Sequence, residues 1–208
     1  NKVFRSDDYG NSWEVISDDL SRQIDRNTLK VYDRVVSIDA VEKNGSTSPY
    51  GTIVALSESP IDSNLMAIGT DDGLIQITED GGKNWRKIDN ISGAPNQSYV
   101  KNVYLSQHDS NLMYVAFNHH KYGDFKPYVF KSEDKGNSWK SISNNLPERG
   151  SVYSIEEDHV DKDLIFCGTE FGVFFSPNKG DRWKELGNGL ILVPWGIAWL
   201  VMPYNNSI

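Results

Sequence analysis

The sequence has 208 residues, a hydrophobic fraction of 38% and a formal net charge of −8 at pH 7. A chain of this length can bury a substantial core, and its negative charge argues against nucleic acid or an anionic membrane as partner. The single cysteine, Cys167, cannot form an internal disulfide, and its apolar neighbours favour a core position. The apolar run 189–203 is broken by Pro194 and is too short to span a membrane.

Four copies of one octapeptide, Ser/Thr-x-Asp/Asn-x-Gly-x-x-Trp, recur along the chain. The Asp or Asn side chain is expected to bond backbone amides of its own turn, and the Gly to adopt a positive φ. The Ser or Thr hydroxyl adds a second local bond, and the Trp buries its ring while its N–H finds a partner. These four boxes are therefore predicted to be structural hairpin turns rather than catalytic or metal sites. Their residues are Ser6, Asp8, Gly10 and Trp13; Thr78, Asp80, Gly82 and Trp85; Ser132, Asp134, Gly136 and Trp139; and Ser176, Asn178, Gly180 and Trp183.

The segments between the boxes repeat too, in the order strand, turn, strand, hairpin, strand, box, strand. Four short strands in a unit of roughly 40–50 residues are typical of a propeller blade. We therefore predict an all-β fold, a β-propeller of four-stranded antiparallel blades, present as an incomplete segment of a larger propeller. In chain order the parts are a half blade (1–17), an insertion (18–48), blades at about 49–89, 98–145 and 150–189, and a trailing apolar strand of a truncated next blade (190–208).

Unequal spacing of the boxes locates two insertions. The box tryptophans lie 72, 54 and then 44 residues apart, so the first two units carry extra residues. The larger insertion, 18–48, falls between the last strand of one blade and the first strand of the next. The smaller, 118–126, falls between the second and third strands of its blade. Both connections emerge on the same rim of a blade, opposite the boxes, and loops on a rigid scaffold are where function concentrates.

The repeats resemble the sortilin-like BNR, or Asp-box, propeller proteins, whose bacterial members are often labelled "glycosyl hydrolase". The resemblance is carried by segments 1–13, 21–31, 48–85, 124–139 and 164–183, and the chain departs from the family pattern beyond about Gly189. It implies a secreted or cell-envelope propeller that binds polypeptides without catalysis and has further blades in a parent chain. Sialidases, xyloglucan-cleaving hydrolases and a photosystem II assembly factor share the box, so the motif does not choose among these functions.

An enzyme remains the alternative. The Arg-Ile-Pro motif that announces a sialidase is missing, since Val-Phe-Arg-Ser precedes the first box. A carboxylate-pair glycoside hydrolase requires two acids on one cavity, and Asp71, Asp72, Glu170 and Asp124 are the candidates on the insertion-bearing rim. Asp-Asp-Gly and Glu-Phe-Gly are also ordinary hairpin sequences, which favours a structural role for the acids.

Our main prediction is a non-catalytic propeller that binds a polypeptide or carbohydrate ligand through the 18–48 and 118–126 insertions. The expected ligand-binding residues are His119, His120, Tyr122 and Phe125, because amphipathic aromatic side chains dominate recognition surfaces. Adjacent residues on an extended segment point in opposite directions, so the two histidines are not expected to share a metal ion. No motif predicts a cofactor.

Overall fold

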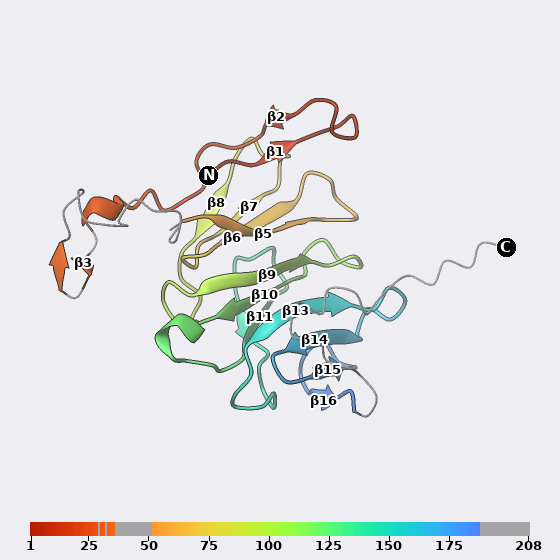
Figure 1. Cartoon of the computed structure of the whole chain (residues 1–208). Helices are drawn as coiled ribbons and strands as arrows, with labels where there is room; N and C mark the ends of the chain where they lie inside the picture. The colour runs from red at the N-terminus through yellow and green to blue at the C-terminus, as the bar shows by residue number, and fades with distance from the viewer. Residues whose placement is uncertain (29, 32, 36–50, 188–208) are drawn as a thin grey trace.

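The computed structural model describes residues 1–28, 30–31, 33–35 and 51–187, and these form an all-β stack of small sheets (Figure 1). Three sheets have four strands each, with every neighbouring pair antiparallel and in sequence order. They are β5 (Ile53–Glu58), β6 (Met66–Thr70), β7 (Ile75–Thr78) and β8 (Arg86–Ile88); β9 (Tyr99–Leu105), β10 (Met113–Asn118), β11 (Tyr128–Ser132) and β12 (Lys140–Ser141); and β13 (Val152–Glu157), β14 (Ile165–Thr169), β15 (Val173–Ser176) and β16 (Lys184–Glu185). This meander of four strands is the blade of a propeller.

A two-stranded sheet precedes the first of these blades, and the rest of the ordered structure is short. Strand β1 (Phe4–Arg5) pairs with β2 (Glu14–Val15) to form a half blade at one end of the stack. The insertion after it contains a 3-10 turn, η1 (Arg26–Thr28), and the hairpin of β3 (Lys30–Val31) and β4 (Arg34–Val35). A second 3-10 turn, η2 (His120–Tyr122), lies between β10 and β11. Within the described part of the chain, no helix is long and apolar enough to cross a membrane. The trailing strand expected over 190–208, and residues 36–48 of the larger insertion, lie outside the described residues.

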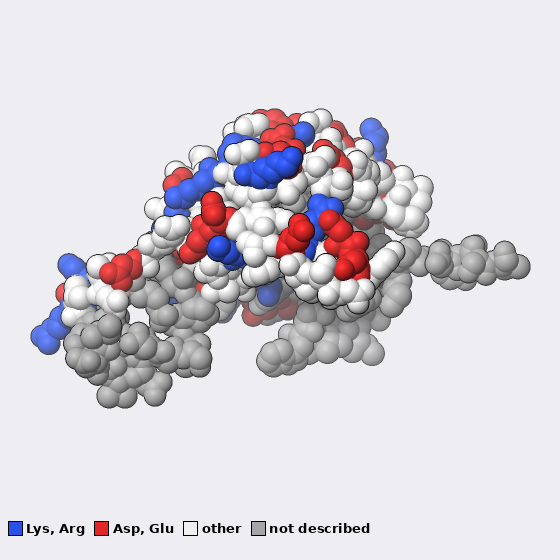
Figure 2. Space-filling view, turned by 90° about the horizontal axis from the view of Figure 1, so that it is seen from above, with Lys and Arg blue, Asp and Glu red and all other residues white. Residues whose placement is uncertain are grey.

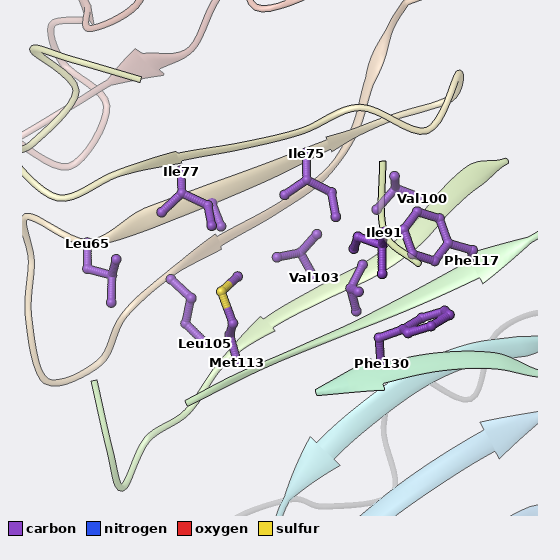
Figure 3. Close-up of a cluster of buried hydrophobic side chains, with 12 residues drawn as sticks. Leu65, Ile75, Ile77, Ile91, Val100, Val103, Leu105, Met113, Phe117 and Phe130 are labelled. Atoms are coloured by element: carbon purple, nitrogen blue, oxygen red, sulfur yellow. The ribbon is translucent and has the colours of Figure 1, made fainter. Parts of the chain in front are cut away.

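The hydrophobic core lies between the blades and follows from side-chain alternation along each strand. On β10, Met113, Val115 and Phe117 point into one cluster, shared with β6 and β7 (Figure 3), whereas Tyr114 and Ala116 point into a second, shared with β14. Successive side chains of a strand point to opposite faces, so a strand with a blade on each side must be apolar at every position. This is why residues 113–117 of β10 read as an unbroken apolar run and not as an alternation.

The first strand of each later blade packs against the first two strands of the blade before it: β9 contacts β5 and β6, and β13 contacts β9 and β10. The approach is close enough to require glycine at position 69. A Cβ built on Gly69 would lie 2.2 Å from Cγ1 of Val100 in the next blade, far inside van der Waals contact. Cys167 lies in the cluster between the last two blades and is fully buried, as the sequence predicted.

The four boxes share one hydrogen-bond pattern. In each, the Ser or Thr hydroxyl donates to Oδ1 of the Asp or Asn and accepts the N–H of the Gly. Oδ1 also accepts the backbone N–H four residues further on, at 2.8–3.0 Å. The Gly residues all have positive φ, between 79° and 96°. Hydrogen bonds from Asn84 and Ser138 side chains hold the pKa values of Asp80 and Asp134 at about 2, so both carboxylates act as charged acceptors in the turn.

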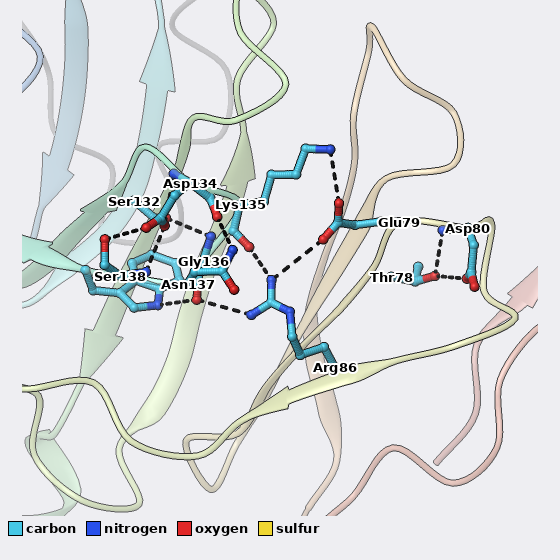
Figure 4. Close-up of polar contacts among 11 residues, drawn as sticks. Thr78, Glu79, Asp80, Arg86, Ser132, Asp134, Lys135, Gly136, Asn137 and Ser138 are labelled. Atoms are coloured by element: carbon cyan, nitrogen blue, oxygen red, sulfur yellow. Dashed lines mark hydrogen bonds and ion pairs between the residues drawn. The ribbon is translucent and has the colours of Figure 1, made fainter.

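The boxes also join neighbouring blades. Arg86 on β8 donates to the backbone oxygens of Lys135 and Gly136 in the next box, and the Lys135 ammonium lies 3.1 Å from Glu79 in the preceding one (Figure 4). The indole N–H of Trp183 donates to the Ile142 carbonyl at 2.7 Å, and the ring is buried.

The expectation that every box tryptophan is buried is wrong for Trp13, which is 62% exposed. The box tryptophans pack against the blade that precedes them in the stack. Trp13 belongs to the first sheet of the described residues, so its ring has no such neighbour there.

Candidate functional site

The blades have two rims with different contents. On one, which we call the box rim, a box amide donates to the turn between the first two strands of its own blade, as in Lys135 N–H to Asn111 O at 2.9 Å. The opposite side, the insertion rim, carries the β6–β7, β10–β11 and β14–β15 hairpins together with the connections between blades. Both insertions emerge there, and η2 and the β3–β4 hairpin lie on the same side of the stack in Figure 1. The candidate catalytic and ligand-binding residues all lie on the insertion rim.

Two of the candidate carboxylates, Asp71 and Asp72, occupy the β6–β7 hairpin. Asp72 is fully buried; Thr70 donates its hydroxyl proton to one carboxylate oxygen, and the Arg22 Nε lies 3.6 Å from the other. Arg22 comes from the larger insertion and also donates to the Asp72 carbonyl, 3.4 Å away. A buried carboxylate beside a guanidinium fixes the path of the insertion across the blade. Asp72 is therefore an anchor for this part of the rim.

The pKa of the Asp71 carboxyl group is raised above its ordinary value. Burial raises it most, and the neighbouring charge of Asp72 adds to the effect, while the N–H groups of Gly51 and Thr52 donate to Oδ1 at 2.7 and 2.9 Å and oppose it. A carboxyl group with a raised pKa is what a general acid requires. The same two backbone bonds also tie Asp71 to the start of β5.

The smaller insertion is a compact turn and not the extended segment that the sequence suggested. His119 precedes η2, shares a hydrogen bond between its Nδ1 and the Ser98 hydroxyl (2.8 Å), and stacks on Tyr122 with ring centres 4.4 Å apart. His120 instead bonds the Asn118 side chain. The two histidines therefore have separate partners, and the Tyr122 ring remains 64% exposed beside them.

The other two candidate acids are placed differently. The Tyr128 hydroxyl donates to Asp124 at 2.6 Å, and this bond is the main cause of the lowered pKa of Asp124. A carboxylate with a lowered pKa stays ionised and makes a poor general acid. Glu170 is exposed on the β14–β15 hairpin, where its backbone N–H donates to the Ser151 carbonyl. The four acids thus lie on hairpins of three different blades, and only Asp71 and Asp72 are adjacent.

Phe125 lies further along the smaller insertion. The Arg149 guanidinium lies 5.0 Å from the centre of the Phe125 ring. The Phe125 carbonyl accepts the N–H of Gly150 at 2.9 Å. This contact ties the insertion to the connection that leads into β13. The ring is partly buried.

A group of side chains that the sequence did not single out lies at the start of the first strands. We call Tyr99, Lys101, Lys121 and Tyr153 the tyrosine–lysine cluster. Lys101 Nζ lies 5.1 Å from the ring centre of Tyr153 and 5.9 Å from that of Tyr99, and Lys121 Nζ lies 5.8 Å from Tyr99. These are cation–π distances. Burial and the charge of Asp71 raise the pKa of Tyr99, so the phenol stays protonated and available as a donor.

The cluster escaped prediction because its members come from three elements: β9, η2 and β13. Only Tyr99 and Lys101 could have been paired from the sequence, because residues two apart on one strand lie on the same face of the sheet. A hollow lined by residues that include Gly73, Ile91, Pro95, Gln97 and Phe117 has room for about one water molecule. The insertion rim therefore offers ligands an aromatic, cationic surface. Among the described residues, no group of three or more His, Cys, Asp or Glu side chains is placed to hold a metal ion.

Comparisons with known proteins define the class of fold. No protein-family model matches the chain, and no curated protein does. Among solved structures, the GH74 enzyme of Niastella koreensis superposes with a TM-score of 0.57 and 14% identity over 88% of this chain and 26% of its own. An ancestral GH74 enzyme superposes with a TM-score of 0.53 and 21% identity, over 66% of this chain and 19% of its own. YCF48 bound to a D1 peptide superposes with a TM-score of 0.52 and 18% identity, over 65% of this chain and 40% of its own.

These likenesses and the four-stranded sheets show that the chain is a β-propeller segment, which confirms the predicted fold class. The chain spans less than half the length of each of these structures. At such identities the likeness shows the fold alone.

Proposed function

We propose that this propeller segment is a non-catalytic binding module that recognises an extended polypeptide or a glycan on the insertion rim. The observation that carries the proposal is the tyrosine–lysine cluster. Two tyrosine rings and two ammonium groups gather where strands β9 and β13 begin, with Tyr153 38% exposed. Tyrosine offers a large apolar ring and a polar tip at small entropic cost, which is why it is enriched in recognition hot spots.

The charge of the cluster favours an acidic polypeptide over a neutral glycan. Lys101 and Lys121 can each pair with a carboxylate, while the rings of Tyr99 and Tyr153 cover the apolar stems of neighbouring side chains. Tyr122 and Phe171, 64% and 57% exposed on the hairpins nearby, extend the aromatic surface. YCF48, one of the similar structures, was solved with a peptide bound, so a propeller of this kind can take such a ligand.

Binding to a displayed library of acidic and neutral peptides tests the proposal. Tyr153→Ala and Lys101→Ala are expected to weaken the selected peptides by roughly thirtyfold, the effect of losing about 2 kcal/mol at a hot spot. Val160→Ala is the matched control, because Val160 is 77% exposed on the box rim, and its affinity should equal that of the wild type. If Tyr153→Ala and Lys101→Ala bind the selected peptides as tightly as the wild type and the Val160→Ala control, the cluster is excluded as the binding site.

Glycoside hydrolysis is the second candidate, favoured by the raised pKa of Asp71 and its position beside Asp72. Two of the similar structures are GH74 enzymes. A panel of β-glucans and sialosides tests this function. Turnover that disappears in Asp71→Asn but survives in Asp124→Asn, whose carboxyl group has a lowered pKa, would establish it.

The resemblance in the repeats supports three further proposals. We propose that the chain is a sortilin-like BNR protein, that it is secreted or located in the cell envelope, and that additional blades complete its ring. Fractionation of cells that express the parent gene tests the location. Recovery of the protein only from the cytoplasm would contradict export.

A further inference from the structure

The first strand of each four-stranded blade contains one extra residue, a β-bulge, and the bulge recurs at the same place in every copy. Along β5, β9 and β13 the pairing with the second strand shifts by one residue, which leaves Val54, Lys101 and Tyr153 without a partner. Each stands eleven residues before the leucine that precedes the second strand of its blade. We call these three residues the bulge row. Bulges of this kind re-aim side chains and are common beside functional sites.

The bulge changes where the side chains of these strands point. Val100 and Val103 are three residues apart, so on a regular strand they would face opposite sides of the sheet. Both instead lie in the core cluster between the first two four-stranded blades, and Val152 and Ile155 share the next cluster in the same way. The extra residue thus absorbs the change of face and stays out of the core. Accordingly, Tyr153 is 38% exposed between two fully buried neighbours.

The bulge row runs from blade to blade along the insertion rim. β5 contacts β9, and β9 contacts β13; the three strands follow one another in this order down the stack in Figure 1. Each bulge lies opposite the end of the second strand that leads into the hairpin of the insertion rim. Neighbouring members interact, since Lys101 Nζ lies 5.1 Å from the centre of the Tyr153 ring. The row therefore presents an aliphatic, a cationic and an aromatic side chain in succession.

The Lys101 ammonium group is available to a carboxylate. In the described part of the chain it forms no salt bridge. It lies over the rings of Tyr99 and Tyr153, and an ammonium group over a ring keeps N–H donors for another partner. On the face shown in Figure 2, the described lysine and arginine side chains are interspersed with aspartate and glutamate, so that face does not compete as an extended basic surface. An acidic side chain is therefore expected to bind at Lys101.

We propose, on the basis of the polypeptide function given above, that the bulge row sets the sequence specificity of the peptide site. The ligand it selects has an acidic residue with an apolar residue on each side. Lys101 pairs with the carboxylate, and Val54 and Tyr153 pack against the two apolar side chains. The blades repeat one backbone geometry and vary the side chain that it presents, so each blade reads one position of the peptide. Charge complementarity at the middle position gives specificity.

Selection of peptides from a displayed random library tests the proposal. The wild type should select peptides that carry Asp or Glu at one fixed position between apolar residues. Lys101→Glu should bind those peptides at least about thirtyfold more weakly, the effect of losing a hot spot, and should itself select Lys or Arg at that position. Lys83→Glu makes the same change of charge at an exposed position in the second box and should keep the wild-type preference.

A second variant tests the order of the row. Val54→Lys places a second cation beside Lys101, so it should add a preference for an acidic residue on one side of the first acid and leave the other side apolar. Circular dichroism confirms that each variant is folded. If Lys101→Glu does not fold, Lys101→Met keeps the length of the side chain without its charge and should lose the preference for an acid.

The outcomes separate this proposal from the peptide function on which it rests. Folded Lys101 variants that still select Asp or Glu at the same position, or a Val54→Lys chain that changes both flanking positions alike, overturn the bulge row as the source of specificity, while peptide binding on the insertion rim stands. A wild type that selects no peptide overturns both.

Discussion

The packing of the box glycines predicts a specific cost for Gly180→Ala. Gly180 has φ +90°, and a Cβ there would lie 2.9 Å from Cβ and 2.6 Å from Cδ1 of Ile142. Ile142 is fully buried, and its Cβ is fixed to the backbone, so the contact cannot be relieved by a rotamer change alone. The left-handed backbone costs an alanine about 1–2 kcal/mol, and overpacking of a core adds about 1–3 kcal/mol. We expect a loss of roughly 2–5 kcal/mol in the free energy of unfolding.

Gly123→Ala is the matched control for the backbone part of that cost. Gly123 has φ +76°, and nothing lies within 4 Å of a Cβ built there, so only the left-handed conformation should be penalised, by about 1–2 kcal/mol. Urea denaturation followed by tryptophan fluorescence gives both values. If Gly180→Ala loses no more stability than Gly123→Ala, the box glycine is not required by contact with the preceding blade, and the interface geometry is wrong.

Three further predictions concern acid, the larger insertion and the cysteine. The pKa values of Asp80 and Asp134 are about 2, below the ordinary 3.8, so their contribution to stability is present above about pH 4 and lost as the pH falls toward about 2. The urea midpoint should fall over that range, and should fall less in Asp134→Asn. Arg22→Met should cost about 1–3 kcal/mol because it leaves the buried Asp72 carboxylate without its cation, and limited proteolysis should then cut within 18–35 faster. Cys167 is buried, and burial raises the pKa of its thiol to about 12; a thiol reagent should therefore modify it only after unfolding, and rapid reaction with the native chain would contradict its core position.

The fold could be predicted because its signals are local and repeated. A box such as Ser132 to Trp139 satisfies its own backbone through bonds that span at most four residues, so its sequence reports its conformation directly. The burial of residues 113–117 on β10 likewise follows from an unbroken apolar run. Repetition then turned four weak local signals into one architecture.

The candidate site was predicted only in part, because its side chains come from distant segments. The sequence pointed to the insertions and to Tyr122 and Phe125, and the structure places both on the insertion rim. No sequence pattern indicated that Lys101 would lie between Tyr99 and Tyr153, since Tyr153 belongs to the next blade. The role of Asp72 was open for the same reason, because its partner Arg22 is 50 residues away.

By itself, the sequence determined the turns, the strands and the all-β propeller class, since hydrogen bonding within a turn and side-chain alternation along a strand are short-range properties. Only the tertiary structure decided which blade faces are covered. Trp13 and Trp183 occupy the same position of two boxes with the same hydrogen-bond pattern, yet one ring is 62% exposed and the other 2%. Burial depends on what the neighbouring blade presents, here Ile142 against Gly180, and no pattern within a single box contains that information.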